Sequence, residues 1–125
     1  MRTAITVTAI ISAVLVPHVG HGATTSFTCD FTMAATPQGL SRQKDFVLRF
    51  VLDVEAKKAY FLGNAGSSEV TIVPNQGGIS FVEIAEKGNV TVTSITSAGE
   101  AVHSRNAIIF DGLVPSQYYG KCVVR

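Results

Sequence analysis

The sequence lacks the short motifs that carry the common enzymatic chemistries. It contains no glycine-rich phosphate loop, no paired-cysteine motif, no His-Glu-x-x-His and no Gly-x-Ser-x-Gly. A glycosidase needs two carboxylates that face each other across a cleft, and no spacing in this chain fixes such a pair. We therefore expect a protein that is not an enzyme and that uses no cofactor.

An excess of charge of either sign is also absent. The chain has 10 Lys and Arg residues against 9 Asp and Glu residues, and removal of an N-terminal leader that contains Arg2 leaves 9 of each. A balanced chain offers no electrostatic footprint for nucleic acid or for anionic lipid. We therefore expect neither nucleic acid nor a membrane surface as a partner.

The longest run without a charge lies at the N-terminus. Arg2 precedes apolar and small residues from Ala4 to Val16, and Gly20-His21-Gly22-Ala23 supplies small residues for a cleavage site. This layout is typical of a secretory signal peptide. The run is shorter than the roughly 20 residues that a relaxed membrane span needs, although an uncleaved signal anchor is the alternative. We predict cleavage after Gly22, or else after Ala23, so that the protein is periplasmic or secreted and has no membrane span.

Cysteine is scarce, with only Cys29 and Cys122 in the chain. They lie near the two ends of the predicted single domain, residues 23–125, and such an even pair in an exported protein is typical of a disulfide. Cys29 lacks the Leu-x-small-Cys context of a lipid anchor. A zinc site would need two further ligands, whereas the domain keeps one histidine, His103. We predict a Cys29–Cys122 disulfide and no metal site.

Helical spacing is missing as well, and a two-residue alternation runs through most of the domain. It places Phe27, Cys29, Phe31 and Met33 on one face of a first strand, and Phe46, Leu48, Phe50, Leu52 and Val54 on one face of a second. Residues 34–44, which contain Pro37 and Gly39, are predicted to form a loop. Further strands are predicted over 59–62, 69–73, 79–85, 90–96, 101–110 and 116–124.

About eight short strands with short connections predict an all-β fold with antiparallel neighbours. In a closed up-and-down barrel the first and last strands are neighbours, as a Cys29–Cys122 disulfide requires. A sandwich with paired terminal strands meets the same requirement. We predict a small antiparallel meander barrel, with a flattened sandwich as the alternative. Large inward side chains such as Phe27 and Phe50 favour a filled interior.

The stretch AVHSRNAIIF, residues 101–110, sets a histidine beside a serine and an arginine. Because consecutive side chains of a strand point to opposite faces, His103 and Ser104 cannot act as a catalytic dyad. The face that holds Ser104 ends in apolar residues, Val102 on one side and Ile108 and Phe110 on the other, so we expect it to point inward. His103 and Arg105 then lie about 7 Å apart on the outer face. Two such donors can bind a carboxylate or a phosphate, and a plain solvated strand face is the alternative.

Two further polar features are candidates. Tyr118 and Tyr119 follow a proline turn and are predicted as a binding rim, although a strand directs one ring inward and the other outward. Glu83 shares a face with apolar neighbours, so it needs a partner such as Arg49 or Arg105 if that face points inward. We expect Glu83 on the outer face or at a rim.

The segments FVEIAEKGNVTVTSIT and GEAVHSRNAIIFDGLVPSQYYGKC, with the early Phe27-Thr28-Cys29, carry a resemblance. In them the chain resembles small exported β-rich proteins of unknown function from Gram-negative bacteria. The resemblance implies a periplasmic location and assigns no functional residue.

The absence of a catalytic signature leaves binding as the expected activity. We expect a non-enzymatic binding or inhibitor-type protein whose partner is a periplasmic or extracellular protein, or a small anionic ligand. Small disulfide-closed β-barrels that block lysozymes share the predicted architecture, a likeness of fold alone. A lipocalin-like carrier of small molecules is the alternative, and it requires a cavity instead of a filled core. A hydrolase that uses His103 is disfavoured by the strand geometry.

Overall fold

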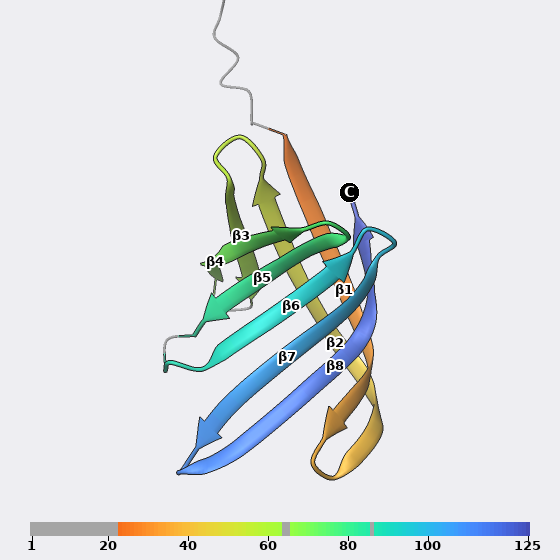
Figure 1. Ribbon diagram of the computed structural model, residues 1–125, viewed down its shortest axis with the longest axis vertical. Coiled ribbons are helices and arrows are strands. Elements are labelled where there is room, and N and C mark those ends of the chain that lie inside the picture. The colour runs from red at the N-terminus through yellow and green to blue at the C-terminus, as the bar shows by residue number, and fades with distance from the viewer. Residues whose placement is uncertain (1–22, 64–65, 86) are drawn as a thin grey trace, which may run out of the picture.

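The computed structural model describes residues 23–63, 66–85 and 87–125, and it shows a closed antiparallel barrel (Figure 1). Its strands follow one another around the barrel in chain order: β1 (Thr24–Thr36), β2 (Gly39–Asp53), β3 (Lys58–Gly63), β4 (Gly66–Asn75), β5 (Gly78–Ile84), β6 (Val90–Thr96), β7 (Glu100–Ile109) and β8 (Gly112–Val124). β8 pairs with β1, which closes the barrel. The meander barrel is therefore confirmed over the sandwich. The predicted leader, residues 1–22, lies outside the described residues.

Buried aromatic rings fill the middle of the barrel. Phe27 and Phe31 of β1, Phe50 of β2 and Phe81 of β5 are each 7% exposed or less. The ring of Phe81 stacks on Phe50 with centroids 4.8 Å apart and meets Phe27 edge-on at 5.4 Å. Burial of each such side chain contributes about 1.5–3 kcal/mol to folding. The expected filled core is present.

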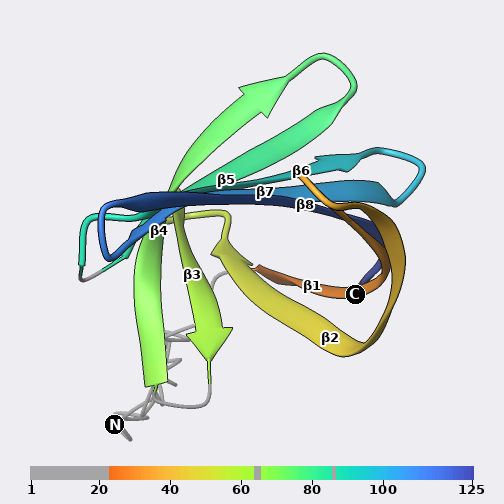
Figure 2. The same cartoon turned by 90° about the horizontal axis from the view of Figure 1, so that it is seen from below.

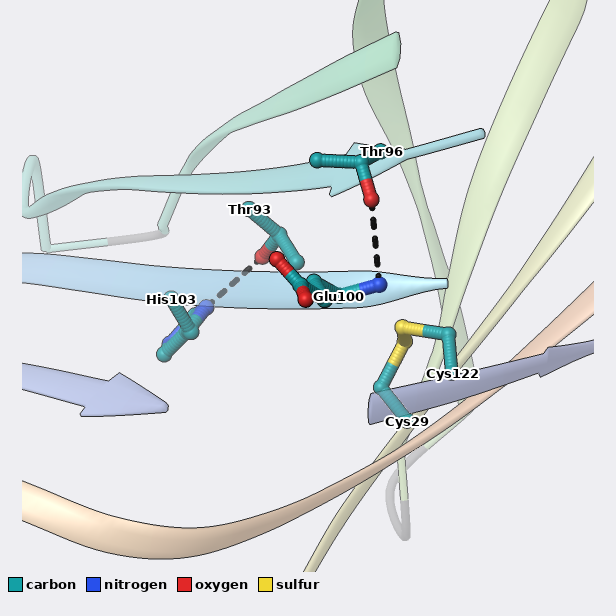
Figure 3. Close-up of a disulfide and its surroundings, with 6 residues drawn as sticks. All are labelled: Cys29, Thr93, Thr96, Glu100, His103 and Cys122. Atoms are coloured by element: carbon teal, nitrogen blue, oxygen red, sulfur yellow. Dashed lines mark hydrogen bonds between the residues drawn. A yellow bond between two sulfur atoms is a disulfide. The ribbon is translucent and has the colours of Figure 1, made fainter. Parts of the chain in front are cut away.

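The barrel is closed covalently as well as by hydrogen bonds. Cys29 of β1 and Cys122 of β8 are direct partners in the register, and they form the predicted disulfide (Figure 3). Two residues before Cys122, Gly120 lies opposite Phe31, and a Cβ atom on Gly120 would overlap the carbonyl oxygen of Asp30. This glycine therefore permits the close approach of β8 to β1.

The loop predicted over residues 34–44 is wrong. β1 continues to Thr36 and β2 begins at Gly39, so only Pro37 and Gln38 form the turn. A bulge between Phe31 and Met33 shifts the alternation, so Ala34 is buried in the barrel while Met33 is only half-buried. Alternation did not reveal these strand residues because much of this hairpin is exposed, and exposed strands need no apolar face.

Two long hairpins, β1–β2 and β7–β8, project beyond the shorter strands at one end of the barrel (Figure 1). The β6–β7 pairing ends at Val90↔Asn106, whereas β7 stays paired with β8 as far as Ile109↔Gly112. We call this end of the barrel the mouth, and residues 107–114 the β7–β8 arm. The opposite end, where β1 begins and β8 ends, is called the terminal end.

The tip of the β7–β8 arm is apolar and exposed. Phe110 is 100% exposed, Leu113 77% and Ile108 65%. Phe110 and Asp111 form the turn, and both have positive φ angles, 48° and 64°. Asparagine, aspartate and glycine favour this backbone region, whereas an aromatic residue is rare there.

No helix long and apolar enough to cross a membrane occurs among the described residues.

Candidate functional site

The predicted orientation of β7 is wrong, because His103 points into the barrel. His103 is 6% exposed, and its partners in the register are Thr93 of β6 and Tyr118 of β8. Ile108 and Phe110, whose hydrophobicity favoured the opposite assignment, lie on the arm beyond the core. Their apolar side chains are therefore no evidence for which face of the strand is buried.

His103 is held by one hydrogen bond and by aromatic packing. Its Nδ1 atom lies 2.7 Å from Thr93 Oγ1 (Figure 3). The ring centroids of Phe31, Phe46 and Tyr118 lie 5.8, 5.9 and 6.0 Å from that of the imidazole. Burial lowers the pKa of His103 from 6.5 to about 4, with a smaller contribution from the nearby Arg105 guanidinium. The imidazole is therefore neutral at pH 7.

Nearer the mouth, a row of polar residues crosses the inner face of adjacent strands. The register pairs Glu83 of β5 with Thr91 of β6, Thr91 with Arg105 of β7, and Arg105 with Ser116 of β8. Direct partners in a sheet project from the same face, and this face is the one that holds Phe81 and His103. We call Glu83, Thr91, Arg105 and Ser116 the polar row.

The polar row faces an apolar wall across a cavity. The cavity has a volume of about 220 Å³ and opens at the mouth. Its apolar wall consists of side chains from β2 and β3: Phe46, Leu48, Phe50 and Phe61. Glu83, Thr91 and Arg105 of the polar row, together with His103, line the other side. Seen from below, β6–β8 form one side of the barrel and β1–β2 curve around the other (Figure 2).

Glu83 lies on the inner face, half-buried at the mouth, which agrees with the predicted rim position and not with the outer face. Ser68 Oγ of β4 donates a hydrogen bond to Glu83 Oε2 at 3.3 Å. This bond joins β4 to β5 beyond the last backbone pair, Thr71↔Val82. Ser68, instead of Arg49 or Arg105, is therefore the partner that the structure gives to this carboxylate.

The two predicted tyrosines point to opposite faces, as strand alternation requires. Tyr118 turns inward and its ring stacks on Phe46, with centroids 4.4 Å apart. Tyr119 is 38% exposed on the outside, and its hydroxyl donates to Gln117 Oε1 at 2.7 Å. The structure thus places His103, Arg105 and Tyr118 on the inner face of the sheet, with Arg105 exposed, and leaves Tyr119 on the outer face.

Arg105 also borders a second hollow. This space of about 300 Å³ lies between the Pro37–Gln38 turn and the inner face of the β7–β8 arm, and Ala107 also lines both spaces. Arg105 is an exposed residue, so a ligand that enters through the mouth can reach it. Arg105 was a candidate from the sequence, whereas the apolar wall beside it was not predicted, because β2 and β3 approach Arg105 only through the closure of the barrel.

No cluster of three or more His, Cys, Asp or Glu side chains in the described part of the chain is arranged to hold a metal ion. A scan of protein-family models, a search of curated proteins and a search of solved structures found no match to this chain. Functional inference therefore rests on the geometry of the cavity.

Proposed function

We propose that this protein is an exported, non-enzymatic binding protein that takes a compact ligand into the barrel mouth. The supporting observation is the cavity, in which an apolar wall faces Glu83, Thr91 and Arg105. Ligand sites are generally concave and mostly apolar, with a small number of placed polar groups that orient the ligand. The mouth has this composition.

The size of the cavity limits the ligand. Its volume of about 220 Å³ lies below the roughly 300–1,000 Å³ of sites for drug-sized molecules and above the about 150 Å³ that holds benzene. One ring or one short aliphatic group therefore fits. A lipocalin-like carrier of larger molecules is less well supported, because Phe31, Phe50 and Phe81 fill the barrel below the mouth.

The Thr93–His103 contact has the distance of a nucleophile and its base, but its setting favours a structural role. Thr93 is 1% exposed, so a substrate carbonyl cannot approach its hydroxyl. This burial supports the proposal that the protein is not an enzyme. Export is supported by the leader-like residues 1–22, by the resemblance to exported proteins, and by a disulfide of the kind that persists in oxidising compartments.

Benzyl alcohol, a single ring with a neutral polar group, tests the cavity directly. We expect it to shift the backbone NMR signals of residues that line the cavity. Thr91→Phe places a ring in this space and should weaken binding at least tenfold. Thr71→Phe makes the same exchange at an exposed residue of β4 and should leave binding unchanged. Equal binding to both variants, or no shifts at the cavity of the unaltered protein, would contradict the proposed function.

A further inference from the structure

We infer that the cavity selects a zwitterion. The expected ligand is a compact molecule that has an apolar side chain and carries both a carboxylate and an ammonium group, as α-amino acids with apolar side chains do. The inference rests on the proposed function and adds the charge pattern of the ligand. Glu83 and Arg105, two residues of the polar row that line the same small cavity, carry it.

The two charges lie on one wall with a gap between them. Glu83 and Arg105 are both register partners of Thr91, on either side of β6. Neighbouring strands lie about 4.8 Å apart, so the Cα atoms of Glu83 and Arg105 are separated by about 10 Å. The Thr91 side chain lies between them on the same face and can donate or accept a hydrogen bond.

Neither charge is neutralised by the other. Ser68, which donates to the Glu83 carboxylate, belongs to β4, on the side of β5 away from Arg105. Among the described residues, no carboxylate lies within the 4.0 Å of an ion pair with Arg105. The wall therefore presents a negative and a positive group separately, with a hydroxyl between them.

A ligand with one charge matches only half of this wall. A simple anion is attracted by Arg105 but repelled by Glu83, and a simple cation meets the reverse arrangement. The guanidinium fork matches a carboxylate, and the Glu83 oxygens accept from an ammonium group. A zwitterion satisfies both groups, while its side chain packs on the apolar wall formed by Phe46, Leu48, Phe50 and Phe61.

The distance between the two charges of the ligand narrows the chemical class of the expected ligand further. Arg105 has a long, flexible side chain that can extend across Thr91 towards the Glu83 carboxylate, so the carboxylate and the ammonium group of a ligand bound by both residues lie close together. In an α-amino acid both groups are attached to one carbon atom. A residue at either end of a peptide keeps only one of the two charges, so the expected ligand is a free amino acid with one compact apolar side chain.

Four probes that share one ring test the inference by calorimetry at pH 7 and low salt. L-phenylalanine carries both charges, 3-phenylpropionate only the carboxylate, 2-phenylethylamine only the ammonium group, and benzyl alcohol neither. We expect L-phenylalanine to bind at least tenfold more tightly than either singly charged probe. Discrimination should weaken as salt is added, because both charged groups are reached by solvent.

Two variants test which residue binds which charged group of the ligand. Arg105→Gln should abolish the preference for L-phenylalanine over 2-phenylethylamine, because the carboxylate then has no guanidinium to meet. Glu83→Gln should abolish the preference over 3-phenylpropionate. Arg49→Gln and Glu69→Gln remove the same charges from exposed residues of β2 and β4, and both preferences should persist in these controls.

The outcomes separate this inference from the proposed function. If a singly charged probe binds as tightly as L-phenylalanine while benzyl alcohol still binds and Thr91→Phe blocks it, the zwitterion inference is wrong and the cavity remains a binding site. If none of the four probes binds to the cavity, both the inference and the proposed function are overturned. If the preference for L-phenylalanine over the singly charged probes persists in Arg105→Gln and Glu83→Gln, these two residues do not bind the charged groups of the ligand.

Discussion

The two ends of the barrel differ in how their polar groups are used. At the terminal end, Ser26 and Arg125 exchange backbone hydrogen bonds of 2.7 and 2.9 Å, and Cys122 N donates to Gly99 O at 2.7 Å beside the disulfide. At the mouth, β4 residues before Thr71 pair only with β3, and β7 residues after Asn106 pair only with β8. Glu83, Thr91 and Arg105 at this end line a cavity.

This difference indicates that one end of the barrel stabilises the fold and that the other end is available for binding. The disulfide and the aromatic core stabilise the fold, whereas the mouth carries charged residues around a cavity and an exposed apolar tip. Functional sites commonly retain features that do not stabilise the fold. The contrast can be tested by changing one end and measuring the other.

Removal of the disulfide should have the largest effect. The two cysteines are separated by 93 residues, and opening a loop of about this length lowers the free energy of unfolding by about 4.7 kcal/mol in the chain-entropy description. We expect this loss for Cys29→Ala combined with Cys122→Ala, measured by urea unfolding.

Reduced protein without the substitutions provides the control for the loss of packing at the two sites. Benzyl alcohol should still bind to the fraction of the double variant that remains folded, because the mouth lies at the other end. A change in unfolding free energy below about 0.5 kcal/mol would show that the terminal end does not depend on its covalent link.

Acidification should destabilise the fold through His103, which is buried in the barrel between the two ends. His103 has a folded-state pKa of about 4 against 6.5 for an ordinary histidine, so the unfolded chain takes up the proton first. The stability due to the neutral imidazole is complete above pH 6.5 and is lost as the pH falls towards 4. The full loss is about 3 kcal/mol.

His103→Gln keeps a hydrogen-bonding side chain beside Thr93 and removes this titration. Unfolding free energies of both proteins, measured at a series of pH values, give the histidine contribution by difference, since the carboxylates are common to both. Parallel pH profiles for the two proteins would rule out the buried neutral histidine as the source of acid sensitivity.

Substitution at the arm tip should have the smallest effect and the opposite sign. Phe110 has a φ angle of 48° and is fully exposed, so its ring gains no packing in return for an unfavourable backbone conformation. Phe110→Asn should raise the free energy of unfolding by about 0.5–1 kcal/mol. Phe110→Ala removes the ring without easing the backbone, so it should give no such gain. Equal effects of the two substitutions on the unfolding midpoint would contradict the backbone explanation.

The architecture could be predicted from the sequence because its signals are local. β6 begins and ends at the predicted residues, Val90 and Thr96, since its apolar and polar residues alternate between two clear turns. The pairing of Cys29 with Cys122 followed from there being two cysteines only, and it placed the first strand beside the last.

The site was predictable only in part, because alternation divides a strand into two faces without saying which one is buried. His103 and Arg105 do share a face, as predicted, but the apolar residues that set its direction belong to an exposed arm. The proximity of Glu83 to Arg105 depends on the register of β5, β6 and β7. No local pattern encodes that register.

The hydrogen bonds between Ser26 and Arg125 have a topological consequence. Because the start of β1 and the end of β8 lie side by side, the strand order is a ring with no preferred first member. A short linker between residues 125 and 23, with new ends opened in the Ser97–Gly99 turn, gives a circular permutant that leaves the mouth untouched. For the same reason, residues 23 and 125 lie at the same end of the barrel, so a tether attached to either of them leaves the barrel at the end away from the cavity.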